Sequence, residues 1–99
     1  MTTRNDELAI QTREVTILNR FGLHARPAMQ LVELANRFAC KIELSNGALT
    51  VDAKSIMSVM RLAATQGTVL NIVADGDDAE EALGKLEALF AEGFGEMNE

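Results

Sequence analysis

The sequence predicts a mixed α+β domain in which helices cover one sheet, with the element order βαββαβα. Two observations predict this fold class. Segments with apolar residues at every second position alternate along the chain with segments whose apolar residues recur at helical spacing. Each strand then has one apolar face and each helix one apolar stripe, and both are buried most economically when the helices pack on one side of the sheet. We therefore expect a two-layer, open-faced β-sandwich.

The first strand and the first helix are separated by a short loop that contains Gly22. Residues 14–19 alternate through Val15 and Ile17, which predicts a strand. Pro27 opens a helical stretch, because its fixed φ suits the first turn of a helix. The apolar stripe of this helix is expected to comprise Ala28, Leu31, Val32, Ala35, Phe38 and Ala39.

A β-hairpin is predicted next. Residues 41–45 and 48–53 alternate between apolar and polar. The dipeptide Asn46-Gly47 between them favours a two-residue type I′ turn, in which both residues have positive φ. Cross-strand partners share a face of the sheet, so the paired residues should all face the core. The expected pairs are Leu44 with Leu49, Ile42 with Val51, and Cys40 with Ala53.

Three further elements complete the order. Residues 55–62 are predicted to form a short helix, residues 68–74 a strand and residues 79–92 the last helix. Asp78, followed three residues later by Glu81, is typical of a helix start, and Gly93 is typical of a residue just past a helix end.

Composition and charge exclude several classes of function. Apolar residues make up 47% of the chain and charged residues 24%, as in soluble globular proteins. No apolar run approaches the roughly 20 residues that a membrane helix needs, and the N-terminus is too polar for a secretory signal, so we expect a cytoplasmic protein without membrane insertion. The net charge of -6, with scattered lysines and arginines, argues against nucleic acid. The lone Cys40 excludes an internal disulfide, and without a Cys/His cluster no metal or other cofactor is expected.

The length of 99 residues fits one domain with one hydrophobic core. We assign residues 13–96 to this domain. Residues 1–12 are polar and are interpreted as a flexible or strand-extending N-terminal extension. We expect a monomer.

His24, the lone histidine, is the candidate reactive group. It lies just before the predicted first helix, where the unpaired N–H groups of the first turn carry partial positive charge and can bind an anion. A neutral imidazole has one ring nitrogen whose lone pair can attack a phosphoryl donor. The guanidinium of Arg26, two residues on, can bind phosphate oxygens. A histidine near an arginine also occurs without any function, so position alone leaves both interpretations open.

Two motifs resemble those of a known family. The first motif is the run GLHARPA at residues 22–28. It is similar to the active-site motif of the HPr family, the histidine phosphocarriers of the bacterial phosphotransferase system. The family's second signature, around its regulatory serine, is similar to the run KSIMSVM at residues 54–60. The likeness extends from about Val15 to Glu96, and the predicted element order is the family's order.

The resemblance implies a specific chemistry. His24 would accept a phosphoryl group on Nδ1 from phosphorylated enzyme I and pass it to a IIA protein or domain. The chain would then be a carrier in a relay rather than an enzyme. The side chain of Arg26, with the backbone amides of Ala25 and Arg26, would hold the phosphoryl group. The family's sheet is antiparallel, with four strands in the order 1-4-2-3 and three helices on one face.

The second motif implies a regulatory site and a partner surface. Ser55 stands where some HPr proteins are phosphorylated by HPr kinase/phosphorylase, although its residue type and position also predict a helix N-cap. The family's partner surface would include Ile56, Met57 and Met60. This short helix has more apolar residues than one buried stripe can take, so some of them must face solvent. These three residues can also be interpreted as core.

The branch of the family and the class of function stay open. The runs NRFG at residues 19–22 and ALFAEGF at residues 88–94 look more like NPr, the nitrogen-related paralogue, whereas KSIM at residues 54–57 is closer to the HPr proteins of sugar transport. An alternative function is a regulatory docking module, whose binding to a kinase, transcription factor or metabolic enzyme is switched by phosphorylation of His24 or Ser55. A third is a small ligand-binding domain in which His24 is inert.

Overall fold

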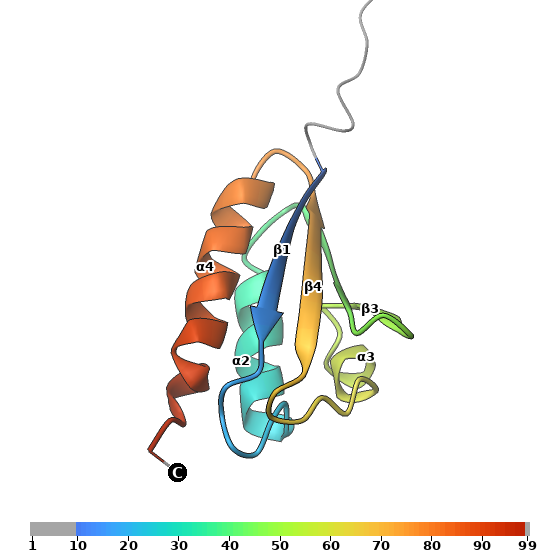
Figure 1. The fold of residues 1–99 in the computed structure, drawn as a ribbon. Helices are drawn as coiled ribbons and strands as arrows, with labels where there is room; N and C mark the ends of the chain where they lie inside the picture. Colours follow the sequence, from blue (N-terminus) through green and yellow to red (C-terminus); the bar gives the residue numbers. More distant parts are fainter. Residues whose placement is uncertain (1–9, 99) are drawn as a thin grey trace, which may run out of the picture.

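A computed structural model describes residues 10–98 of the chain. The strands and helices follow the predicted βαββαβα order, with one additional 3-10 turn after the last helix (Figure 1). The elements are β1 (Ile10–Thr16), α2 (Ala25–Ala35), β2 (Lys41–Ser45), β3 (Thr50–Asp52), α3 (Ile56–Met60), β4 (Val69–Asp75), α4 (Ala79–Ala91) and η1 (Gly93–Gly95).

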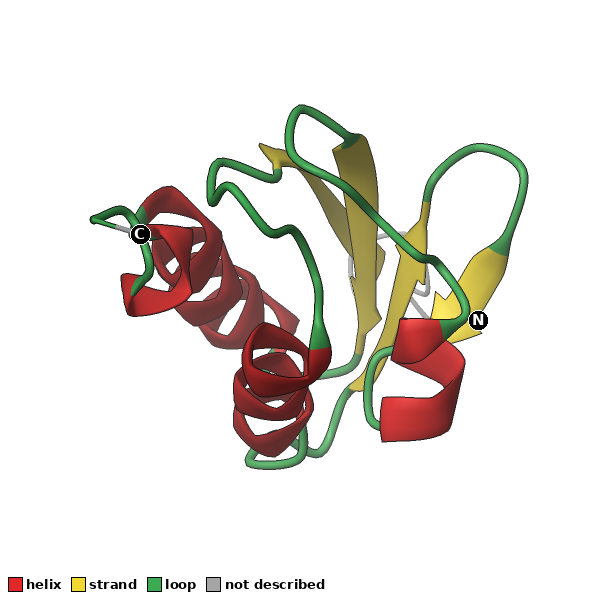
Figure 2. Ribbon diagram, turned by 90° about the horizontal axis from the view of Figure 1, so that it is seen from below, coloured by secondary structure: helices red, strands yellow, loops and turns green. Residues whose placement is uncertain are grey.

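The four strands form one antiparallel sheet in the order β1-β4-β2-β3. The helices lie on one side of this sheet, as the view along the layers shows (Figure 2). The predicted two-layer α+β fold and the strand order implied by the resemblance are both confirmed. Among residues 10–98, no helix combines the length and the apolar character needed to cross a membrane.

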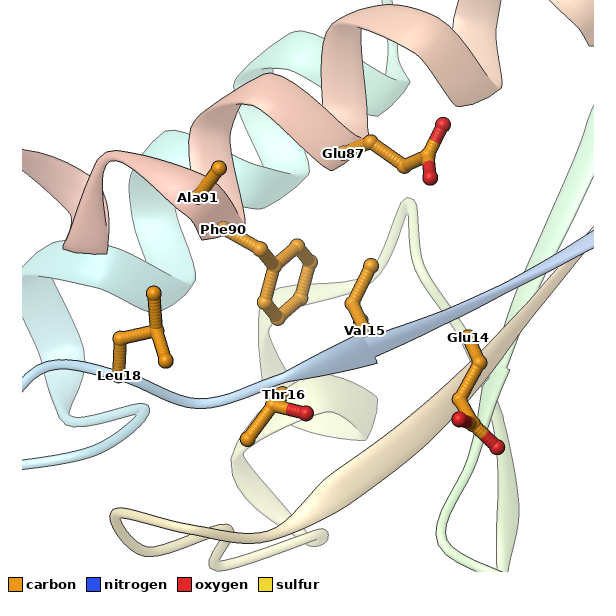
Figure 3. A pocket seen from close by; sticks show the side chains of 7 residues that line it. All are labelled: Glu14, Val15, Thr16, Leu18, Glu87, Phe90 and Ala91. Atoms are coloured by element: carbon orange, nitrogen blue, oxygen red, sulfur yellow. The ribbon is translucent and has the colours of Figure 1, made fainter.

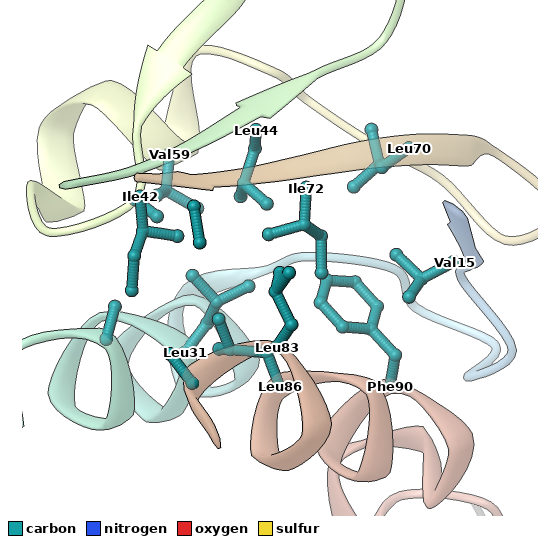
Figure 4. Close-up of a cluster of buried hydrophobic side chains, with 14 of the residues drawn as sticks. Val15, Leu31, Ile42, Leu44, Val59, Leu70, Ile72, Leu83, Leu86 and Phe90 are labelled. Atoms are coloured by element: carbon teal, nitrogen blue, oxygen red, sulfur yellow. The ribbon is translucent and has the colours of Figure 1, made fainter. Parts of the chain in front are cut away.

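The hydrophobic core fills the space between the sheet and the helices (Figure 4). Every strand and every helix contributes to it, and full burial of one large apolar side chain stabilises a fold by about 1.5–3 kcal/mol. Since Leu31 and Ala35 of α2 are completely buried, this packing fixes the helix against the sheet. The largest core side chains include Ile17, Leu31, Ile42, Leu44, Val59, Leu70, Ile72, Leu83, Leu86 and Phe90.

Several element ends differ from the prediction, and the start of β1 and the end of α2 differ most. β1 starts at Ile10, which pairs with Asp75, rather than at residue 14. Residues 10–12, assigned from the sequence to the N-terminal extension, therefore belong to the sheet, and the rest of that extension lies outside the described residues. α2 ends at Ala35 rather than near Ala39, because the side-chain amide of Asn36 donates to the carbonyl oxygens of Val32 (2.9 Å) and Lys54 (3.1 Å) at the helix end.

The hairpin has a longer loop than the predicted two residues. Leu44 pairs with Val51 rather than with Leu49, and the loop spans residues 46–49. The cause is the Asn46 side chain, whose Oδ1 atom accepts hydrogen bonds from the N–H groups of Ala48 (2.9 Å) and Leu49 (2.8 Å). A register shift of two residues leaves every side chain on its original face of the sheet. The predicted core residues are therefore still inside: Cys40, Ile42, Leu44, Val51 and Ala53 are buried and Leu49 is partly buried.

Candidate functional site

The loop before α2 is held in place by Gly22 and Leu23. Gly22 has a positive φ of 67°, and a Cβ atom at this position would collide with the carbonyl oxygen of Ala64. Glycine is therefore required both by the backbone conformation and by the close approach. The N–H of Leu23 donates to the same Ala64 oxygen at 2.9 Å, and the Leu23 side chain is buried. These contacts fix the position from which α2 starts.

His24 is the N-cap residue of α2, but its side chain does not cap the helix. Its backbone is extended (φ -74°, ψ -174°), its carbonyl oxygen accepts the N–H of Ala28 at 3.0 Å, and its imidazole makes no cap hydrogen bond. The side chain is 39% exposed. The imidazole is thus accessible at the end of the helix where the dipole favours an anion. The helix begins at Ala25, two residues before Pro27, so Ala25 and Arg26 are its first two residues.

A buried carboxylate from the far end of the chain completes the site. Nε2 of His24 lies 2.9 and 3.0 Å from the two carboxylate oxygens of Glu96. Arg26 donates to Oε2 of Glu96 through Nε (2.9 Å) and pairs with it through Nη2 (2.7 Å). Nδ2 of Asn19 donates to Oε1 of Glu96 at 3.0 Å. The predicted pair of His24 and Arg26 is brought together, and the sequence analysis missed both Asn19 and Glu96 as members of the site.

A left-handed turn delivers Glu96 to this place. Beyond α4, Gly93, Phe94 and Gly95 all have positive φ, at 59°, 56° and 75°. This conformation is unfavourable for a residue with a side chain. Phe94 is held in it by burial and by edge-on packing against Phe90, with the two ring centres 4.9 Å apart. The glycines around Phe94 were the sequence signal for this turn, but they do not indicate where the chain goes next.

Glu96 is charged despite its burial, with only 2% of its surface exposed. Desolvation raises the pKa of this carboxyl group, but hydrogen bonds from His24, Arg26 and Asn19, together with the positive charge of His24 when its ring is protonated, outweigh it and hold the pKa below its ordinary value of 4.5. The carboxylate is therefore ionised at neutral pH, when it can only accept hydrogen bonds.

Phe21 lies beside the histidine. Its ring meets the His24 ring edge-on, with the ring centres 6.3 Å apart and the planes at 89°. The guanidinium carbon of Arg20 lies 5.3 Å from the centre of the Phe21 ring. Because Phe21 is 57% exposed, it offers apolar contact area directly next to the imidazole.

Ser55 and the predicted partner surface lie on α3, outside the hydrogen-bonded cluster of His24. Ser55 is the N-cap of α3, and its hydroxyl oxygen accepts the N–H of Ser58 at 3.2 Å, as predicted. Ile56, Met57 and Met60 are 36%, 76% and 40% exposed. Their interpretation as core is therefore wrong. Helix α3 packs against α2, and these three apolar side chains are exposed to solvent.

A hollow in the surface lies elsewhere. A groove between β1 and α4 is lined largely by apolar side chains, among them Val15, Leu18 and Phe90 (Figure 3). None of the residues of the His24 cluster lines it. Within the described part of the chain, no group of three or more His, Cys, Asp or Glu side chains could hold a metal ion. We place the candidate site at the partly exposed imidazole, because a titratable ring and a guanidinium meet there and not in the groove.

The fold and the site define a class of protein. A small α+β domain that presents a histidine and an arginine on an open surface, at the positive end of a helix, has the architecture of a histidine phosphocarrier. Comparison with known proteins agrees: the family described as the phosphorylation site of the HPr component of the phosphotransferase system (PTS) matches residues 11–92. The chain belongs to the HPr family.

Relatives from both branches of the family are similar to the chain. Phosphocarrier protein HPr of Cupriavidus necator is 46% identical over 84 residues, which cover 85% of this chain and 94% of that protein. Phosphocarrier protein NPr of Proteus mirabilis is 41% identical over 87 residues, which cover 87% and 97%. The structure of HPr-C-His from Thermoanaerobacter tengcongensis matches with a TM-score of 0.84 at 42% identity, over 87% of this chain and 97% of that one. An HPr dimer from the same organism has also been solved.

Proposed function

We propose that this chain accepts a phosphoryl group on Nδ1 of His24 from phosphorylated enzyme I and passes it to a IIA protein or domain. The observation that carries the proposal is the position and exposure of the His24 side chain. It is partly exposed at the N-terminus of α2, it is not used to cap the helix, and it lies next to the guanidinium of Arg26. Family membership supports the same role.

The transfer is a displacement at phosphorus. The lone pair of Nδ1 attacks the phosphorus atom, an N–P bond forms, and the bond to the donor breaks with its electron pair remaining on the donor. The acceptor protein later displaces Nδ1 in the same way. The chain is a covalent participant and is regenerated at the end of each cycle, so it acts as a carrier rather than as an enzyme and needs no cofactor.

The start of α2 suits the phosphoryl group for electrostatic reasons. The dianion would sit at the positive end of the helix dipole, close to the backbone amides of Ala25 and Arg26. The planar guanidinium of Arg26 offers several N–H donors to phosphate oxygens. A group attached to His24 would be close to both, because His24 is the N-cap residue of α2.

The partners would approach over an apolar surface on α3, the helix that contacts α2. We assign this role to Ile56, Met57 and Met60, which are exposed on α3, because methionine side chains adapt to several partner surfaces. Phosphorylation of Ser55 by HPr kinase/phosphorylase stays a prediction. No contact among residues 10–98 favours the docking-module alternative.

The setting of the relay is also part of the proposal. We place the chain in the cytoplasm, as a monomer that meets one partner at a time, although an HPr dimer is known. Light scattering of the purified chain at several concentrations measures its molar mass and so tests whether it is a monomer. The similarity to HPr and NPr proteins leaves the sugar and nitrogen branches as alternatives.

The test is phosphorylation by enzyme I with phosphoenolpyruvate. The chain should acquire one phosphate that is lost in acid, and the variant His24→Ala should acquire none while keeping the wild-type circular dichroism spectrum. An Arg26→Ala variant should be phosphorylated more slowly. Equal labelling of wild type and His24→Ala, or no labelling of the wild type with several enzyme I preparations, would contradict the proposal.

A further inference from the structure

We propose that Glu96 is a positioning residue for the phosphoryl transfer, which keeps a proton on Nε2 of His24 and so leaves Nδ1 as the nucleophilic nitrogen. The inference rests on the proposed function of His24. Glu96 lies beyond residues 11–92, the part of the chain that matches the family. The family match therefore assigns it no role.

The hydrogen bond between the two residues fixes the tautomer. Both carboxylate oxygens of Glu96 face Nε2 of His24, at 2.9 and 3.0 Å. Because an ionised carboxylate can only accept hydrogen bonds, Nε2 must be the donor and must carry the hydrogen. In the neutral ring the other nitrogen, Nδ1, then holds the lone pair. The geometry thus selects the atom that can attack phosphorus.

The same contact suits both directions of the transfer. When Nδ1 of the neutral ring bonds to phosphorus, the ring becomes positively charged and Nε2 keeps its hydrogen. The negative charge of Glu96 lies against that N–H group and stabilises the cation, as a buried carboxylate does for an imidazolium in a catalytic triad. When the phosphoryl group leaves, Nδ1 recovers its electron pair and the ring is neutral again. No proton has to enter or leave the ring at either step.

The surroundings of Glu96 hold its carboxylate in a defined position. The carboxylate is almost completely buried, and three side chains from two other parts of the chain, Asn19, His24 and Arg26, are hydrogen-bonded to it. The turn that delivers it requires Phe94 in a left-handed conformation with φ of 56°. Strained backbone of this kind persists where the surrounding structure holds it and is concentrated at functional sites.

Glu96 also places the arginine. Nε and Nη2 of Arg26 both lie within 3 Å of Oε2 of Glu96, at 2.9 and 2.7 Å. The carboxylate of Glu96 thus contacts both the guanidinium of Arg26 and the ring of His24. The ion pair holds the guanidinium next to the imidazole before any phosphate arrives, which reduces the ordering needed during transfer.

The experiment compares the full-length wild type with Glu96→Gln and Glu96→Ala. Nitrogen NMR of the His24 ring reports which nitrogen carries the hydrogen, and the initial rate of phosphorylation by enzyme I reports transfer. In the neutral wild-type ring we expect the hydrogen on Nε2 alone, and in both variants a mixture of the two tautomers. The transfer rate should fall about tenfold to a hundredfold in Glu96→Ala, the loss expected for one hydrogen bond to a charged group.

The matched control is Glu92→Gln, which removes an exposed carboxylate from the same end of the chain. It should leave both the tautomer and the rate at wild-type values. A purely structural role of Glu96 would lower the melting temperature of its variants without changing the tautomer. A wild-type ring with its hydrogen on Nδ1, or variants with the wild-type tautomer and rate, would overturn the inference. A wild type that is not phosphorylated would instead overturn the proposed function, and the NMR result would still decide where the hydrogen lies.

Discussion

Asn19 and Glu96, 77 residues apart in the sequence, are joined by a hydrogen bond of 3.0 Å from Nδ2 to Oε1. The same Nδ2 donates to the carbonyl oxygen of Gly22 at 2.8 Å, and Asn19 is only 1% exposed. The variant Asn19→Asp would remove both donors and bring a second carboxylate against Glu96. We expect the free energy of unfolding in urea to fall by about 3 kcal/mol. Asn98→Asp, an exposed position, is the control, and equal effects of the two variants would contradict this account.

The buried carboxylate should make the native state sensitive to acid. The folded pKa of Glu96 lies below its ordinary value of 4.5, so its stabilising effect is complete above that pH and is lost as the pH falls through the folded pKa. The difference in unfolding free energy between wild type and Glu96→Gln should therefore shrink as the pH falls from about 5 to about 3. Urea unfolding over this range measures it. A difference that stays constant down to about pH 3 would argue against an ionised, hydrogen-bonded Glu96.

Gly22 and Gly84 should respond in opposite ways to replacement by alanine. At Gly22 the new Cβ atom would collide with the carbonyl oxygen of Ala64, and the positive φ adds strain, so we expect a loss of about 2 kcal/mol or more in unfolding free energy. Gly84 lies inside α4 with nothing near the position of a Cβ atom. There alanine should stabilise the protein by about 0.5–1 kcal/mol. A neutral Gly22→Ala would mean that the loop before His24 is less tightly fixed than described.

Cys40 should be chemically inert in the folded protein. Burial, together with a hydrogen bond and the negative charge of Asp78, raises the pKa of its thiol from 9.0 to about 11. Since only the thiolate reacts, alkylation by iodoacetamide at about pH 8 should be roughly a hundredfold slower in the native protein than in urea. Mass spectrometry of timed samples measures this ratio. Equal rates in the two conditions would show that the thiol is accessible and ionises normally.

The parts of this structure that depend on local pattern were predictable. The apolar stripes of α2 and α4 and the alternation of the strands predicted most of the core, and the even register shift in the hairpin left the strand part intact. Ala39, predicted for the stripe of the first helix, is exposed. His24 could be placed at a helix N-terminus because the signal, Pro27 after a short glycine-containing loop, lies within a few residues of it.

The parts that depend on which of several possible hydrogen-bond partners a side chain selects were not predictable. Asn46 favours a type I′ turn by composition, yet its side chain bonds to the backbone of Ala48 and Leu49 and sets a longer loop. Asp78 precedes α4 as predicted, but its carboxylate accepts the N–H groups of Ala39 (2.8 Å) and Cys40 (2.9 Å) instead of capping its own helix. Glu96 reaches His24 across 72 residues of sequence, and no local pattern encodes such a contact.

The most direct test of the account is to locate the phosphoryl group on the chain itself. After reaction with enzyme I and phosphoenolpyruvate, phosphorus and nitrogen NMR should show a single N–P bond, at Nδ1 of His24, with hydrogen retained on Nε2. A bond at Nε2, the atom that faces Glu96, or phosphate on any other residue would contradict the account.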